Sequence, residues 1–70
     1  MKQVVYTNDT DGLCELVELF ETDIRRIAVG SEKYCKFELE KRIKQGLDED
    51  YFVLLKHGQS FKIEITGYYL

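Results

Sequence analysis

Residues 13 to 27 carry the most regular hydrophobic pattern of this 70-residue chain. Their apolar side chains recur at spacings of three and four residues, which place them on one face of an α-helix. The residues of this stripe are Leu13, Leu16, Val17, Phe20, Ile24 and Ile27. Most acidic residues of the segment precede Arg25 and Arg26, the order that the helix macrodipole favours. The pattern predicts one long amphipathic helix, with Phe20 at the centre of its buried face.

The ends of this segment carry capping signals, but its second half allows another interpretation. Each of residues 8 to 11 offers a side-chain oxygen for an N-cap, and Gly30 stands where a left-handed C-cap residue is favoured. Residues 24 to 29 are rich in β-branched side chains, which favour strands. The chain could therefore break near Asp23 and continue as a short strand, although the stripe favours a helix.

A second helix is expected from residue 32 to residue 45. Ser31 can cap its start and Gly46 can end it. Three acid-to-base pairs at i,i+4 support it: Glu32 with Lys36, Glu38 with Arg42, and Glu40 with Lys44. Its inward row would be Cys35, Leu39, Ile43 and Leu47. Residues 33 to 40 also alternate as a strand does, but their length and the charge pairs favour the helix.

Strands complete the expected fold. Residues 1 to 7 and 51 to 56 are short β-favouring runs, and Gly58 marks a turn into a last strand. A two-residue turn, His57-Gly58 or Gly58-Gln59, would put four side chains on one face of a hairpin: Phe52, Leu54, Phe61 and Ile63. We predict a single α+β domain over residues 1–70, of order β-α-α-β-β. An antiparallel sheet of about three strands would be packed on one face by two helices.

The other face of that hairpin would stay uncovered and half apolar. A contiguous apolar patch on a small protein most often marks an association surface. The predicted partner-binding residues are Tyr51, Val53, Leu55 and Tyr68. We therefore expect a non-enzymatic protein-binding module, homodimeric or acting as an inhibitor or adaptor of a larger protein. Small acidic chains of this character are common among phage and mobile-element products, which is an analogy only.

No arrangement of residues indicates catalysis or a bound cofactor. The single histidine, His57, has no carboxylate placed to orient it, so no nucleophile with a base is found. Two cysteines and one histidine do not make a zinc site. The five glycines are scattered singly, so no phosphate-binding loop is present. We expect no enzyme, no cofactor and no metal.

One segment partly matches a calcium-binding loop. Asp9, Asp11, Gly12 and Glu18 fall at its third, fifth, sixth and twelfth positions. Thr7 stands at the first position, where an aspartate ligand is needed. Helix capping is therefore the preferred interpretation of these acidic residues, with a weak metal site as the alternative.

A basic face on the second predicted helix gives the best nucleic-acid signal. Four lysines surround Phe37 there: Lys33, Lys36, Lys41 and Lys44. A basic helix followed by a hairpin is the layout of a winged-helix DNA-binding regulator. Glu40 lies within this face, and it holds no arginine or asparagine to read base edges. The net charge of −3 further disfavours DNA, so this function is the alternative.

The sequence also bears on location. We find no leader peptide and no apolar run near the roughly 18 residues that a membrane helix needs. A cytoplasmic protein without membrane contact is expected by default. Cys14 and Cys35 are then expected as reduced thiols rather than a disulfide.

Overall fold

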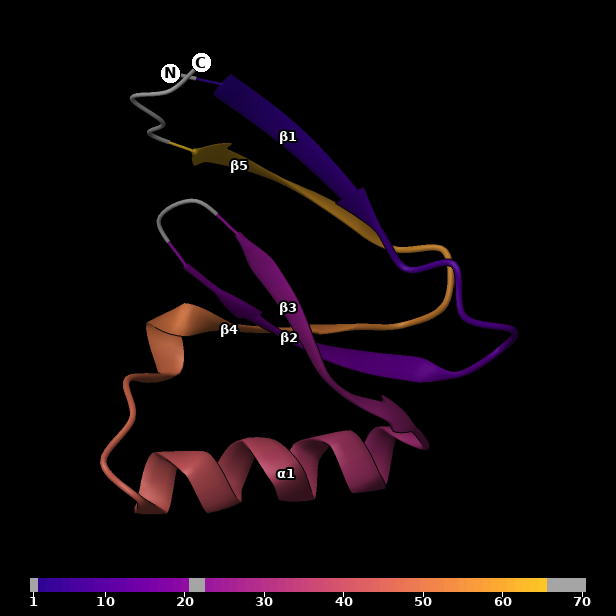
Figure 1. Ribbon diagram of the computed structural model, residues 1–70. Helices are drawn as coiled ribbons and strands as arrows, with labels where there is room; N and C mark the ends of the chain where they lie inside the picture. Colours follow the sequence, from indigo (N-terminus) through magenta and orange to yellow (C-terminus); the bar gives the residue numbers. More distant parts are fainter. Residues whose placement is uncertain (1, 21–22, 66–70) are drawn as a thin grey trace.

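The computed structural model describes residues 2–20 and 23–65, which form an α+β fold (Figure 1). Within these residues there are five strands in two antiparallel sheets and one α-helix. In chain order the elements are β1 (Lys2–Thr7), β2 (Cys14–Leu19), β3 (Ile24–Gly30), α1 (Glu32–Lys44), the short 3₁₀ helix η1 (Glu49–Tyr51), β4 (Phe52–Leu55) and β5 (Ser60–Ile65). The predicted class is confirmed, whereas the predicted numbers of helices and strands are wrong.

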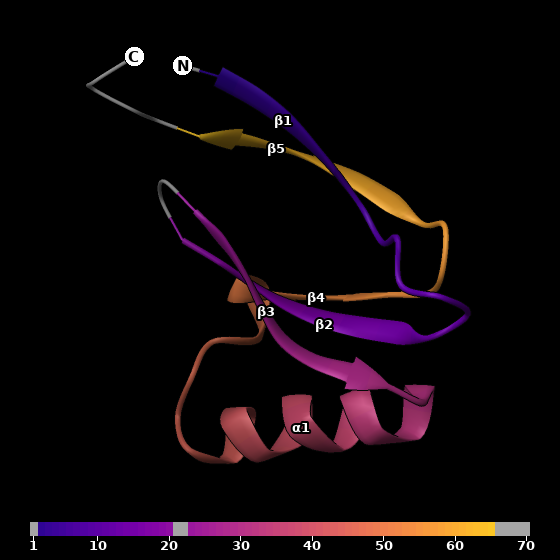
Figure 2. The same ribbon diagram turned by 45° about the vertical axis from the view of Figure 1, so that its right-hand side comes forward.

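The elements stack in three layers. The central layer is a three-stranded sheet in the order β3-β2-β4, in which β2 runs antiparallel to both neighbours. The helix α1 covers one side of this sheet, and a two-stranded ribbon of β1 and β5 lies on the other side (Figures 1 and 2). The ribbon joins strands from opposite ends of the described chain, pairing Lys2 with Ile65 and Thr7 with Ser60.

The predicted helix over residues 13 to 27 is wrong, because these residues form the β2–β3 hairpin. The N–H of Phe20 donates to the carbonyl of Asp23 at 2.8 Å where the hairpin turns. Both faces of β2 are covered, so three successive residues, Glu15, Leu16 and Val17, are all buried. A strand buried on both faces shows no polar alternation in its sequence. The β-branched alternative for residues 24 to 29 is the correct one.

The helix α1 forms where the sequence predicts it. Ser31 is the N-cap, and its hydroxyl accepts a hydrogen bond from the N–H of Tyr34 at 3.1 Å. Gly46, with φ of 95°, stands just past the C-cap residue Gln45. Its left-handed conformation is one that glycine adopts without strain, which explains why the helix ends there.

The main core lies between α1 and the sheet. Four buried residues form it: Leu16, Ala28, Cys35 and Phe52. Side chains alternate along a strand, so Leu54 faces α1 together with Leu16, its partner in the register. Glu15, Val17 and Leu55 point to the opposite face, toward the ribbon, and each is at most 4% exposed. The sheet therefore has two buried faces rather than the single one predicted.

The predicted pairing of the last two strands is wrong, because β4 pairs with β2 and β5 pairs with β1. Their turn does lie at His57-Gly58, closed by the N–H of Gln59 to the carbonyl of Lys56 at 3.0 Å. Among the described residues only glycines have positive φ, and Gly58 has φ of 82°. Positive φ at the third turn position alone defines a type II turn, which splays the strands it joins. The expected common face of Phe52, Leu54, Phe61 and Ile63 therefore does not form.

Asn8 holds the junction from which both sheets diverge. Its side chain is 1% exposed and donates to two carbonyls, that of Leu13 at 3.0 Å and that of Leu55 at 3.2 Å. Its own backbone N–H donates to the carbonyl of Gln59 at 2.9 Å, and its carbonyl accepts from the N–H of Gly58 at 3.0 Å. One buried amide thus ties the β1–β2 connection to the β4–β5 turn.

Candidate binding surface

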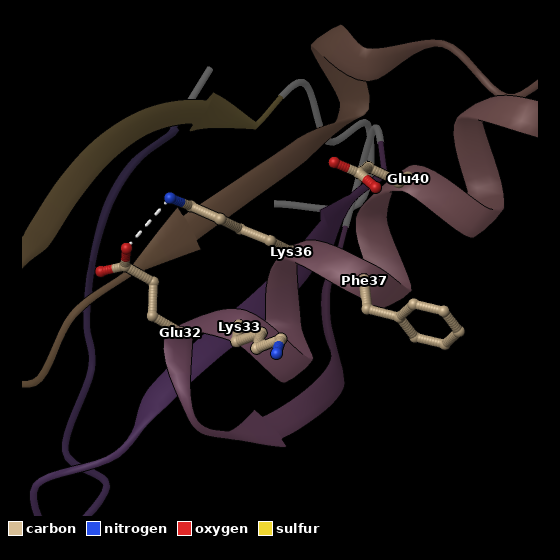
Figure 3. A pocket seen from close by; sticks show the side chains of 5 residues that line it. All are labelled: Glu32, Lys33, Lys36, Phe37 and Glu40. Carbon is tan, nitrogen blue, oxygen red and sulfur yellow. Dashed lines mark ion pairs between the residues drawn. The ribbon is translucent and has the colours of Figure 1, made fainter.

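The outer face of α1 presents the most exposed large apolar side chain among the described residues, the phenyl ring of Phe37, which is 61% exposed. Cys35 points inward from the same helix and is fully buried. Two shallow hollows flank Phe37, one toward Lys33 and Lys36 and the other toward Lys41 and Lys44. Figure 3 shows the ring of Phe37 pointing away from the polar side chains of the first hollow. Phe37 is thus an exposed apolar side chain flanked on both sides by charged residues.

The charges around Phe37 are partly organised by ion pairs. Nζ of Lys36 lies 3.0 Å from Oε2 of Glu32 (Figure 3). Nζ of Lys56, which directly follows β4, lies 3.4 Å from Oε1 of the same carboxylate. The hydrogen bond from Lys36 lowers the pKa of Glu32, and Lys56 adds to the effect. The two hollows beside Phe37 are lined by four lysines and by two glutamates, Glu32 and Glu40. The rim is therefore basic, although the whole chain is acidic.

The predicted partner-binding residues do not share one open surface. Tyr51 is 58% exposed at the end of η1, and Val53 is half-buried. Leu55 is only 4% exposed, so the expectation that its side chain is free at the surface is wrong. The reason is that the ribbon covers the sheet face predicted to be open. Tyr68 lies outside the described residues.

Tyr51 lies instead in a third surface hollow with residues from the end of β2. This hollow is lined by Glu18, Leu19, Phe20 and Tyr51. Phe20 is 38% exposed here, so its predicted place at the centre of a buried face is wrong. The guanidinium of Arg25 stands 4.7 Å from the centre of the Phe20 ring. The role of Tyr51 in binding a partner stays a prediction.

A buried carboxylate connects the ribbon to the sheet. Glu15 on β2 is fully buried, and its Oε2 accepts hydrogen bonds from the hydroxyl of Tyr6 at 2.6 Å and from Nε of Arg26. Arg26 also reaches Asp9, with Nη2 3.3 Å from Oδ1. Burial raises the pKa of Tyr6, and its hydrogen bond to Glu15 raises it further. The sequence marks Glu15 as one of several acidic residues, and only its partners on other strands distinguish it.

The residues of the partial calcium loop and the cysteines occupy separate places. Asp9 and Asp11 lie in the β1–β2 connection, whereas Glu18 lies near the far end of β2. In the described part of the chain, no group of three or more histidine, cysteine, aspartate or glutamate side chains is placed to hold a metal ion. Cys14 and Cys35 are free thiols, and burial raises the pKa of Cys35. These positions carry no argument for metal chemistry.

Comparison with protein-family models, with curated proteins and with solved structures finds no match to this chain. Within residues 2–20 and 23–65, no helix is long and apolar enough to cross a membrane. The candidate site therefore rests on the geometry of α1.

Proposed function

We propose that this protein is a small non-enzymatic protein-binding module that docks on a larger partner, as an inhibitor or adaptor, through the outer face of α1. The observation that supports it is the exposure of Phe37 at the centre of a charged rim. Binding energy at protein interfaces concentrates in a few anchor side chains surrounded by a polar rim. Phe37 has this position on α1.

The charge of the rim indicates what the partner presents. Lys33, Lys41 and Lys44 are exposed and stand within one or two helical turns of Phe37, whereas Glu40 is the acidic residue that lines both hollows beside it. A partner with an apolar socket bordered by aspartate or glutamate complements this pattern, because opposite potentials steer association and fix orientation. The proposed partner is therefore an acidic protein surface.

The winged-helix alternative loses its structural basis. A wing is a hairpin that follows the recognition helix, but here β4 and β5 belong to different sheets. The lysines of α1 still favour contact with polyanions in general. DNA binding is accordingly kept as an outcome of the test, recognisable by a steep dependence on salt.

The experiment places a photo-crosslinking phenylalanine analogue at position 37 of the full chain in the cells that produce it. The crosslinked protein is then purified and titrated calorimetrically with the unmodified chain. Phe37→Ala should weaken binding roughly thirtyfold or more, as the loss of an anchor residue does. Because Phe37 is 61% exposed, the variant should melt within a few degrees of the original chain.

Tyr51→Ala is the matched control, since Tyr51 is an aromatic side chain of similar exposure (58%) that contributes to a different hollow. It should leave the affinity for the same partner unchanged. Loss of affinity with Tyr51→Ala but not with Phe37→Ala would move the site to the sequence-predicted residue. Binding of duplex DNA at physiological salt, reduced by Lys33→Gln with Lys44→Gln, would replace the proposal by the alternative.

A further inference from the structure

The described strands present four free sheet edges, and three of them carry features that oppose pairing with another chain. On the edge strand β3, the register passes from Leu16–Ala28 to Val17–Arg26, so Ile27 is an extra residue that makes a β-bulge. The edge strand β4 has only four residues. On β5, Lys62 and Glu64 place exposed charges beside the free edge. Bulges, short strands and charges are the usual protections of natural edges.

The fourth edge, that of β1, has no bulge, is longer than β4, and has one charged residue, Lys2, at its start. Its six residues pair with β5 in an unbroken register. The side chains of residues 3 to 7 carry no charge, in a chain in which 33% of residues are charged. Val5 is 58% exposed. Both views show β1 at the outer margin of the molecule, beyond β5 (Figures 1 and 2). From residue 3 to residue 7 the edge is therefore uncharged, regular and accessible.

The hydrogen bond next to the ribbon shows which backbone groups of β1 are free. The N–H of Asn8 points to β5, where it donates to the carbonyl of Gln59. Backbone groups alternate in direction along a strand, so those of Tyr6 and Val4 also point to β5. The N–H and C=O groups of Gln3, Val5 and Thr7 point the other way, to the free edge.

We propose that β1 pairs antiparallel with β1 of a second copy of this chain, about a two-fold axis at Val5. This register sets Val5 against Val5 of the second copy, Val4 against Tyr6, and Gln3 against Thr7. All three free backbone positions are then used, whereas an axis at Val4 leaves Thr7 outside the paired positions of the strand. The pair of Val5 with Val5 is β-branched with β-branched and that of Val4 with Tyr6 is β-branched with aromatic, which are favourable cross-strand combinations.

The two-stranded ribbon gives a second reason for a second copy. A two-stranded ribbon is marginally stable by itself in water, and this one has only half-buried side chains against the central sheet. Pairing of the two β1 strands creates one sheet in the order β5-β1-β1-β5. No charged side chain between residues 3 and 7 opposes another across the axis. This interface extends the proposed binding function to a second copy of the chain, and it does not involve Phe37.

The test is sedimentation equilibrium of the full chain over a range of concentrations. The original chain should dimerise, and Val5→Lys should weaken dimerisation by roughly a hundredfold or more, because it opposes two like charges at the axis. Glu64→Lys is the control, since it changes a charge at the other edge of the same ribbon, and it should leave the dimer intact. A chain synthesised with N-methyl-valine at position 5 should also be monomeric, because it lacks one free donor but keeps its β1–β5 hydrogen bonds. Circular dichroism establishes that each variant keeps its fold.

A chain that stays monomeric at millimolar concentration would overturn the inference, as would a dimer that survives both changes at Val5. A dimer abolished by Phe37→Ala would assign self-association to α1 instead. The Val5→Lys variant should bind the acidic partner at the original affinity. Docking through Phe37 and dimerisation through β1 are thus tested independently, and either can fail without the other.

Discussion

The two sheets of this protein differ in how they are stabilised. The β3-β2-β4 sheet has α1 against it and contains fully buried residues such as Leu16 and Val17. In the β1–β5 ribbon, the side chains that alternate toward the sheet are only half-buried: Val4, Tyr6, Phe61 and Ile63. The radius of gyration is 12.6 Å, against about 11 Å expected for a compact domain of this length. Hydrophobic burial holds the sheet and α1 together, whereas the ribbon is attached by half-buried side chains over Val17 and Leu55 and by specific hydrogen bonds.

The largest effect is expected from removing a side chain of the main core. Leu16→Ala should lower the free energy of unfolding by about 2 to 5 kcal/mol, as large-to-small substitutions at buried sites do. The matched change in the ribbon, Ile63→Ala, should cost less than half as much, because Ile63 is only half-buried. Urea unfolding monitored by circular dichroism gives both values. Equal losses would show that ribbon and sheet share one core.

Asn8 provides the next test, because it joins the two regions. Asn8→Ala leaves the carbonyls of Leu13 and Leu55 without a buried donor and should cost about 1 to 3 kcal/mol. Asn8→Asp retains the oxygen that accepts from the N–H of Thr10 but loses the amide donor. It should be nearly as destabilising in the same urea experiment. A stable aspartate variant would mean that the local turn, not the junction, is what Asn8 provides.

Removing the hydrogen bond by which Tyr6 attaches the ribbon should lower the free energy of unfolding by less than the Asn8 changes do, and the loss should depend on pH. Tyr6→Phe removes one hydrogen bond to Glu15 and should cost about 1 kcal/mol at neutral pH. The pKa of Tyr6 is raised above its ordinary 10.0, chiefly by burial. The folded state therefore favours the neutral phenol, a contribution complete below pH 10.0 and lost as pH rises through the folded-state pKa. Melting curves from pH 8 to 11 should converge for the two chains, and a constant difference would contradict this account.

The smallest effect is expected at Phe20, although its place in the apolar stripe predicts one of the largest. At 38% exposure, Phe20→Ala should cost about 1 kcal/mol or less, mainly through the lost contact with the Arg25 guanidinium. Comparison of its melting temperature with that of Leu16→Ala separates the strand interpretation from the helix interpretation. Similar large losses for both would restore the stripe as a core.

Local signals in the sequence are sufficient for α1 and insufficient for β2 and β3. The cap at Ser31, the ion pair of Glu38 with Arg42 at 2.8 Å and the left-handed Gly46 all act within a few residues. For β2, the environment is set by distant residues, since Phe52 covers one face and Tyr6 contributes to the other. The sequence of a strand that is covered on both faces does not alternate between apolar and polar residues, so periodicity does not identify it as a strand.

The sequence predicts part of the candidate surface. Helical spacing places Lys33, Phe37 and Lys41 on one face of α1, and this face does lie outward. The exposure of Leu55 could not be predicted, because it depends on whether β5 pairs with β4 or with β1. A single positive φ at Gly58 and the hydrogen bonds of Asn8 decide between these pairings.

The pairing of residues 2–7 with residues 60–65 also sets an order of folding. The β2–β3 hairpin and α1 close over short stretches of chain, so they can form early. The ribbon must bring together the most distant strands, and its loop-closure entropy is lost before any of its contacts form. During synthesis, β1 leaves the ribosome before β5 and remains without its partner until β5 follows. Over that interval a strand without a charged side chain from residue 3 to residue 7 has both edges free, a condition that favours co-translational aggregation.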